Sequence, residues 1–179
     1  MTLIGVHTNN RTNRAAIRAA DDRELRKWQR EMVIRSCVDA VETALRLQGK
    51  CMNLAYPQLP LAEAEELHGL LGVDAHTIGA NAATLRMLNA RMVATACAEL
   101  YSAATDPDFF KTFEKLPSRW TDEDERAFSV GYARIEKARD GLVRHASTEL
   151  FALEGVDSEE VKQEQRRLRD VVRRYTGTV

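Results

Sequence analysis

The amino-acid sequence predicts an all-α fold, an antiparallel bundle of three to four long helices with short connecting helices. Apolar residues recur every three to four positions over three long segments, which is the period of a helix with one buried face. The 179 residues include only 4 Pro and 9 Gly, and 6% are aromatic, which is too few for a sheet protein with many turns. This length suits one compact bundle, which we place at residues 12–156.

The first element follows a flexible tail expected at residues 1–11. Thr12 or Asn13 can cap a long helix that reaches about Gln48, where Gly49 supplies a C-terminal stop. Its apolar stripe runs through Leu25, Trp28, Met32, Cys37 or Val38, Val41 and Leu45. Residues 50–60 contain two prolines, so we expect a loop there.

The central element is the most apolar part of the chain. A short helix is expected at Leu61–Leu71, ended by Gly72, and Asp74 can cap a helix over Ala75–Ala104. Within Ala75–Ala104 the only formally charged side chains are Arg86, Arg91 and Glu99. A helix that is apolar on most sides is buried by neighbours. We therefore expect Ala75–Ala104 to be one continuous helix at the centre of the bundle.

A short aromatic element comes next. Asp106 occupies an N-cap position and Pro107 the first helical position, and Leu116-Pro117 closes the element. Its aromatic residues are Phe109, Phe110 and Phe113. We interpret them as a cap that closes one end of the bundle, with a partner-binding patch as the alternative.

Two further helices complete the prediction. Thr121 caps a long helix that ends at Gly155, and Gly131 and Gly141 would let another element approach it closely. Asp157 with Glu160 resembles a capping box, and it starts a C-terminal helix at residues 157–179. The stripe of this helix is Val161, Leu168, Val172 and Tyr175. It packs either on the bundle or on a second subunit.

No motif for catalysis, cofactor binding or metal binding is assembled in the sequence. Glu65 and His68 have the i, i+3 spacing of di-iron bundles, but a second Glu-x-x-His is missing. His145 lies beside an apolar stripe and is interpreted as a histidine satisfied by a neighbour. Cys37, Cys51 and Cys97 form no CxxC pair and are expected to be buried, inert thiols. We therefore predict a protein that is not an enzyme and has no cofactor.

Basic side chains near both ends of the chain are the basis of an alternative hypothesis, binding to nucleic acid. Residues 1–50 carry 10 basic and 6 acidic side chains, and arginines also collect in the last 23 residues. A row of guanidinium groups on a helix can follow phosphates. Acidic residues are interleaved at i, i+3 and i, i+4 spacings, so we favour a self-paired, solvated face.

The sequence indicates a cytoplasmic protein. Ala75–Ala104 is long enough to cross a bilayer, but its charged side chains and its Asn and Thr residues oppose insertion. The N-terminus lacks the basic region and apolar run of a signal peptide.

Three stretches resemble a loose group of small helical-bundle proteins from actinobacteria and their phages. They are RELRKWQREMVIRSCVDAVE in the first helix, LRMLNARMVATACAELYSA in the central one and IEKARDGLVRHASTEL in the helix after it. The resemblance covers most of residues 12–153 and implies a helical bundle without catalytic residues. Preference for Arg (20) over Lys (6) is typical of GC-rich genomes of this kind.

These observations predict a non-enzymatic helical bundle that acts through protein–protein interaction, encoded by a phage or an actinobacterium and directed at a host process. The partner is a host protein or a second copy of the chain, and we expect a homodimer. The alternative is a DNA-associated regulator that uses the basic terminal helices. The residues expected to make contacts are Arg14, Arg18, Trp28, Phe109, Phe110, Leu168, Val172 and Tyr175.

Overall fold

The computed structural model is all-α, as the sequence predicts. It describes residues 3–55, 61–151, 166 and 170, and no strand occurs among them. The long helices are α1 (Leu3–Ala55), α2 (Leu61–Met87), α3 (Arg91–Ala104) and α5 (Asp122–Phe151). The short elements are α4 (Pro107–Lys111), η1 (Thr112–Glu114) and η2 (Pro117–Arg119).

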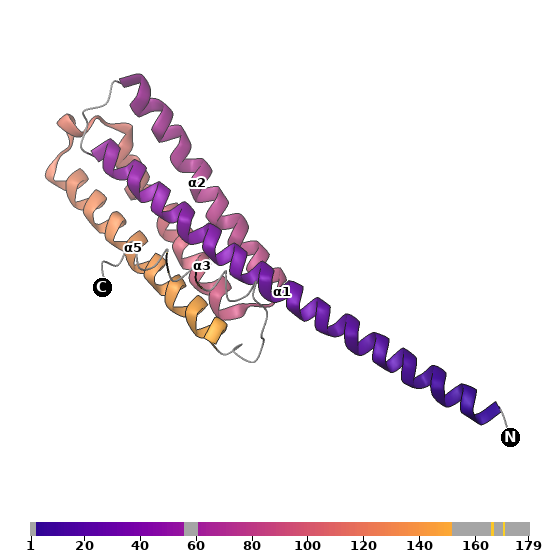
Figure 1. Cartoon of the computed structure of the whole chain (residues 1–179). Coiled ribbons are helices and arrows are strands. Elements are labelled where there is room, and N and C mark those ends of the chain that lie inside the picture. Colours follow the sequence, from indigo (N-terminus) through magenta and orange to yellow (C-terminus); the bar gives the residue numbers. More distant parts are fainter. Residues whose placement is uncertain (1–2, 56–60, 152–165, 167–169, 171–179) are drawn as a thin grey trace.

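Four helices pack around one core. Helix α1 contacts α2, α2 contacts α3, α3 contacts α5, and α5 returns to α1 (Figure 1). Apolar side chains from all four helices are fully buried between them, among them Val41, Ile78, Val93, Leu100 and Ile135. Only the carboxyl-terminal part of α1 takes part, because its first buried residue among the described side chains is Ile34.

Helix α1 is longer than the sequence indicates. Its 53 residues begin at Leu3, so residues 3–11 are helical and the predicted tail is wrong there. Gly49 does not stop the helix, and the predicted loop is wrong for residues 50–55. A glycine inside a helix costs only about 1 kcal/mol relative to alanine. The buried neighbours Leu47, Cys51 and Leu54 offset that cost, since they pack only if the helix continues.

The predicted central helix is wrong at its start and in its continuity, whereas its end at Ala104 is confirmed. Helix α2 runs through Gly72 and Asp74 without interruption, and the break comes at Leu88–Ala90. There Asn89 has a φ of 60°, a left-handed conformation that asparagine tolerates better than most residues. Helix α3 then returns along α2, and Cys97 Sγ lies 3.6 Å from the Ile78 carbonyl oxygen. The segment Ala75–Ala104 is therefore a helical hairpin.

Asp74 lies inside α2, so the helix cap predicted at this residue is wrong. Asp74 instead forms an ion pair with α1. Its side chain is buried between α1 and α2, and Asp74 Oδ2 lies 2.6 Å from Lys50 Nζ. Arg46 Nε lies 3.8 Å from the other carboxylate oxygen. A buried carboxylate needs such partners, because leaving it unpaired costs several kcal/mol. The ion pair holds α2 in register on α1.

Both predicted caps around the aromatic element are confirmed. Asp106 Oδ1 accepts hydrogen bonds from the backbone N–H groups of Asp108 and Phe109, and Pro107 is the first residue of α4. Thr121 Oγ1 accepts from the backbone N–H of Asp124, and Asp124 Oδ2 accepts from the backbone N–H of Thr121. This reciprocal pair is a capping box at the start of α5.

Candidate functional site

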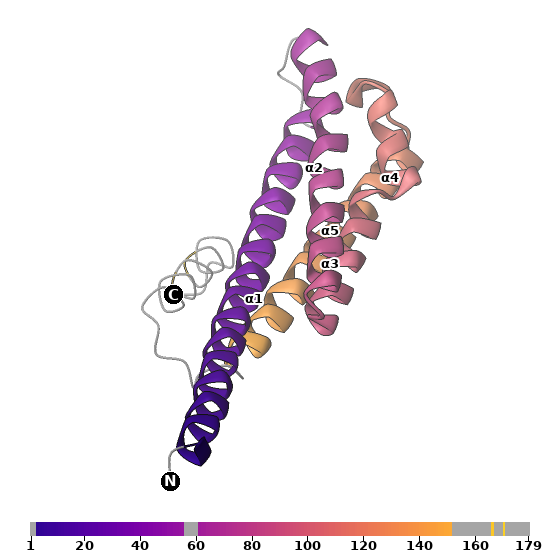
Figure 2. The same ribbon diagram turned by 90° about the vertical axis from the view of Figure 1, so that its right-hand side faces the viewer.

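The amino-terminal part of α1 projects from the bundle. We call residues 3–33 the α1 arm. It is about 46 Å long at 1.5 Å per residue, and both views show it extending beyond the other helices (Figures 1 and 2). Every side chain from Ile17 to Trp28 is exposed. An isolated helix of this kind is marginal in water, since most helical stability in proteins comes from tertiary packing.

The α1 arm carries an apolar stripe. Ile17 is 60% exposed, Leu25 53% and Trp28 52%, and Met32 is half-buried. At 100° per residue these four side chains fall within about 80° of one another around the helix axis. They point nearly to the opposite side of α1 from Ile34, Cys37 and Val41, the buried residues at the start of the bundle part of α1. Helices that pack on the core-facing side of α1 would therefore not cover this stripe.

The opposite face of the α1 arm is basic. Arg23, Arg26, Lys27 and Arg30 fall within about 100° of one another, roughly 170° from the apolar stripe. Part of this charge is engaged locally. Arg23 Nε donates to the Ala19 carbonyl oxygen at 3.0 Å, and Lys27 Nζ lies 3.6 Å from Glu31 Oε1. Arg18 is exposed, and Arg14 belongs to α1 while its side chain lies outside the described residues.

The aromatic residues close one end of the bundle. Phe109 is 1% exposed and packs edge-on against Phe110 and Phe113, with ring centroids 6.0 and 5.2 Å away. Trp120 and Phe128 join the same cluster, 5.3 Å apart. Phe109 is thus a core residue and offers no surface to a partner, and Phe110 is half-buried. The interpretation as a cap of the bundle is confirmed.

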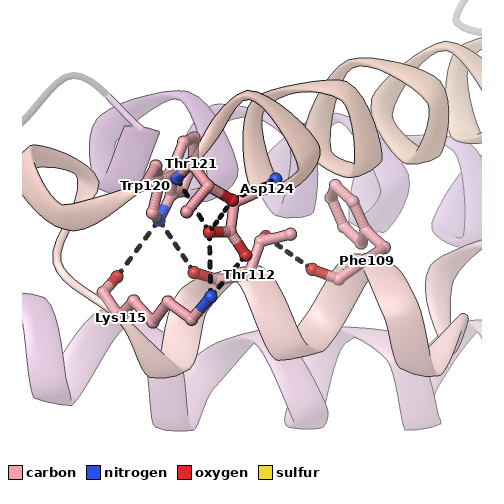
Figure 3. A network of polar contacts seen from close by, with 6 residues as sticks. All are labelled: Phe109, Thr112, Lys115, Trp120, Thr121 and Asp124. Carbon is pink, nitrogen blue, oxygen red and sulfur yellow. Dashed lines mark hydrogen bonds and ion pairs between the residues drawn. The ribbon is translucent and has the colours of Figure 1, made fainter.

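Hydrogen bonds fix this cap (Figure 3). Trp120 Nε1 donates to the carbonyl oxygens of Thr112 and Lys115, at 2.9 and 3.2 Å. Lys115 Nζ in turn lies 2.7 Å from Asp124 Oδ1. Hydrogen bonds from Lys115, and then from Thr121, lower the pKa of Asp124 from its usual value of 3.8 to about 2. These contacts connect the chain between η1 and α5 to the first turn of α5.

A pocket of about 450 Å³ lies beside the cap, between the ends of α1 and α2 and the η1–η2 segment. Its walls include Glu65 and His68, the predicted i, i+3 pair, together with Leu54, Phe113 and Leu116. Among the described residues, no group of three or more His, Cys, Asp or Glu side chains is arranged to hold a metal ion. Two ligands alone do not define a metal centre, because transition-metal sites use three or four.

A second, more polar hollow of about 400 Å³ lies between α3 and α5. Its lining includes small residues, among them Ala103, Ala138 and Gly141, together with Lys137, Arg144 and His145 of α5 and Glu99 of α3. Arg134, also in its wall, is ion-paired with Asp106. All of these charged side chains are exposed, so the surrounding water screens them.

The buried reactive groups belong to the packing. Cys37, Cys51 and Cys97 are all buried, as expected, and none forms a disulfide. Burial raises the pKa of the Cys97 thiol to about 12, and burial together with the nearby Asp74 carboxylate does the same for Cys51. Arg139 Nη1 donates to Gln48 Oε1 at 2.7 Å and ties α5 to α1. Neutral, enclosed thiols of this kind are poor nucleophiles.

The last three expected contact residues, Leu168, Val172 and Tyr175, lie outside the described part of the chain, as do Gly155 and the Asp157–Glu160 capping box. Two residues of that region are described: Arg166 and Asp170 have helical backbone and exposed side chains. Within the described ranges, no helix combines the length and apolar character needed to cross a bilayer.

Comparison with protein-family models, with curated protein sequences and with solved structures finds no match to the chain. The feature that the sequence reasoning missed is the direction of the apolar stripe. Trp28 was placed on a stripe continuous with Val41, although the two lie about 140° apart around an ideal helix. The signal was present in the spacing, since the apolar residues of the α1 arm and those of the bundle part lie on different faces of α1.

Proposed function

We propose that the protein acts through protein–protein interaction and that the apolar stripe of the α1 arm is its contact surface. The observation that carries the proposal is the exposure of Ile17, Leu25 and Trp28 on one face of a helix that projects from the bundle. Tryptophan is among the residues that most often dominate binding energy at protein interfaces. A helix with i, i+3 and i+4 apolar positions typically binds another amphipathic helix.

The partner we expect is a host protein or a second copy of the chain, as the sequence suggested. A homodimer would bury the stripe through a two-fold axis, so that one surface serves both copies. Light scattering of the purified protein distinguishes these partners. A mass of two chains supports the second copy, and a mass of one chain supports a different protein.

The basic face of the α1 arm favours a second candidate function, binding to duplex DNA. A continuous, exposed basic helix can enter the major groove, as in leucine-zipper proteins. Four cations within about 100° are enough to follow a phosphate backbone. Two of these cations are engaged locally, Arg23 by the Ala19 carbonyl oxygen and Lys27 by Glu31, which argues for the protein partner.

Two variants on opposite faces of the same helix test the proposal. Leu25→Asp with Trp28→Asp alters the stripe, and Arg26→Glu with Arg30→Glu alters the basic face. Tagged full-length proteins are compared for the host proteins and for the duplex DNA that they retain. We expect the variant with Leu25→Asp and Trp28→Asp, the stripe variant, to retain no host protein. The variant with Arg26→Glu and Arg30→Glu, the basic-face variant, should retain it as the wild type does.

The reverse result contradicts the proposal. Retention of DNA that weakens steeply with added salt and disappears in the basic-face variant would assign the α1 arm to nucleic acid. Both variants should melt like the wild type, because neither changes a residue of the bundle core. That melting comparison is the control for misfolding.

A further inference from the structure

The apolar stripe of the α1 arm has an acidic border. Around the helix axis, Asp21 lies within the stripe, and Glu24 and Glu31 lie along one edge of it, within about 40°. The cations of the α1 arm between residues 23 and 30 lie on the opposite face. A helix that covers the stripe therefore needs apolar side chains for Leu25 and Trp28 and cations for Glu24 and Glu31.

The chain itself continues at the right place to supply such a helix. Helix α5 ends at Phe151, close to the point where α1 leaves the bundle, and both views agree on this (Figures 1 and 2). The sequence continues for 28 residues beyond Phe151. A helix over residues 157–179 would be about 34 Å long, and the stripe from Ile17 to Met32 spans about 22 Å.

Two residues of the segment beyond Phe151 are described. Arg166 and Asp170 are helical and exposed. In a helix over residues 157–179, a spacing of 100° per residue would place Val161, Leu168, Val172 and Tyr175 within about 60° of one another and roughly 170° from Arg166 and Asp170. This second stripe is about 21 Å long, which matches the stripe of the α1 arm. On one side of this stripe the next cations are Arg169 and Lys162, about 60° and 80° from Val172 around the axis.

We propose that residues 157–179 dock as an amphipathic helix on the apolar stripe of the α1 arm, with the Lys162 and Arg169 edge beside Glu24 and Glu31. The inference rests on the proposed function, since it places an intramolecular competitor on the surface assigned to the partner. It also defines that partner by its chemistry. The partner presents an amphipathic helix with a basic edge and must displace residues 157–179 to bind.

Trp28 reports on this contact directly. The chain has two tryptophans, and Trp120 belongs to the aromatic cap at the other end of the bundle. Acrylamide quenching is measured on the full chain, with Trp28→Phe as the reference that isolates the signal of Trp28. Leu168→Asp with Val172→Asp should raise the quenching constant of Trp28 about twofold, because the docked helix no longer shields the indole ring from the quencher.

The matched control lies on the exposed face of the same segment. Arg166→Ala with Asp170→Ala should leave the quenching of Trp28 at the wild-type value. Thermal melts show whether each variant keeps the bundle. An unchanged quenching constant in a folded Leu168→Asp, Val172→Asp protein would overturn the proposal.

Charge reversal tests the orientation of the contact. Glu24→Arg with Glu31→Arg should also expose Trp28, and adding Lys162→Glu with Arg169→Glu should restore its protection. If the combined variant does not restore the protection of Trp28, Lys162 and Arg169 do not lie beside Glu24 and Glu31. Quenching that depends on protein concentration, with a mass of two chains in light scattering, would assign the stripe to a second copy instead. These measurements use the purified chain without a partner. A negative result would therefore contradict the docking of residues 157–179 and would leave the proposed binding of a partner to be tested separately.

Discussion

The backbone of Gly131 in α5 lies directly against the ring of Phe109 in α4. A Cβ atom at residue 131 would lie 2.3 Å from Phe109 Cδ2 and 2.6 Å from Cγ, closer than real Cβ contacts allow. The absence of a side chain at residue 131 is what lets the most buried aromatic ring of the cap reach the core. The cap therefore depends on one glycine in the middle of a long helix.

Gly131→Ala is expected to lower the free energy of unfolding by about 1–3 kcal/mol, the usual cost of overpacking a core. Gly141→Ala is the matched control in the same helix, because a Cβ there meets nothing within 4 Å. Gly141→Ala should leave the free energy of unfolding unchanged or raise it by up to about 1 kcal/mol. Urea denaturation of both variants measures the difference, and equal stability would mean that Phe109 does not pack on Gly131.

Neighbouring residues of α3 should respond very differently to the same change. Val93 is 0% exposed and Met92 is 59% exposed. Val93→Asp places a carboxylate in the core and should cost at least ~3 kcal/mol of a total stability of about 5–15 kcal/mol. Met92→Asp should change the thermal midpoint little. If both variants melt like the wild type, α3 is not in the core.

The corner between α2 and α3 depends on the conformation of Asn89. Its φ of 60° suits asparagine and glycine, and a branched side chain there costs roughly 1–2 kcal/mol. Asn89→Gly should therefore keep or raise the free energy of unfolding, whereas Asn89→Val should lower it by about that amount. Chemical denaturation checks the order of the three proteins, and a stable valine variant would argue for one continuous helix.

The capping box of α5 predicts a dependence of stability on acid. The pKa of Asp124 is about 2 in the folded protein and 3.8 ordinarily, so folding favours the ionised form. Its contribution is complete above about pH 4 and is lost as the pH falls toward 2. Asp124→Asn should flatten the decline of the thermal midpoint in that range. Asp122→Asn, in the same first turn and exposed, serves as the control, and identical pH profiles for wild type and Asp124→Asn would contradict the assignment.

Local signals in the sequence were sufficient for the caps and for the fold class. Asp106-Pro107 and Thr121-x-x-Asp124 each define a helix start through neighbouring backbone groups, so no tertiary information is needed. The helix ends failed for the opposite reason. Gly49 and Gly72 read as stops, but buried neighbours such as Cys51 and Leu71 hold the helix through them. Tertiary packing outweighs a glycine that costs about 1 kcal/mol.

The exposure of the expected contact residues was only partly predictable. Trp28 is predicted to make contacts, and the structure places its side chain on an exposed face of the α1 arm. Phe109 was assigned to the same group and is buried, since its exposure depends on Gly131, 22 residues further along the chain. The Lys50–Asp74 and Arg139–Gln48 contacts also join residues that no local pattern connects.

Photocross-linking from two adjacent residues of the α1 arm tests the central claim most directly. A photoreactive phenylalanine analogue replaces Leu25, in the apolar stripe, or Arg26, about 100° around the helix. The account predicts that position 25 forms a cross-linked protein product, resistant to salt and lost in the Ile17→Asp variant, whereas position 26 forms little. Equal cross-linking from both positions, or cross-linking to DNA from position 26 alone, would contradict the claim that the stripe is the contact surface.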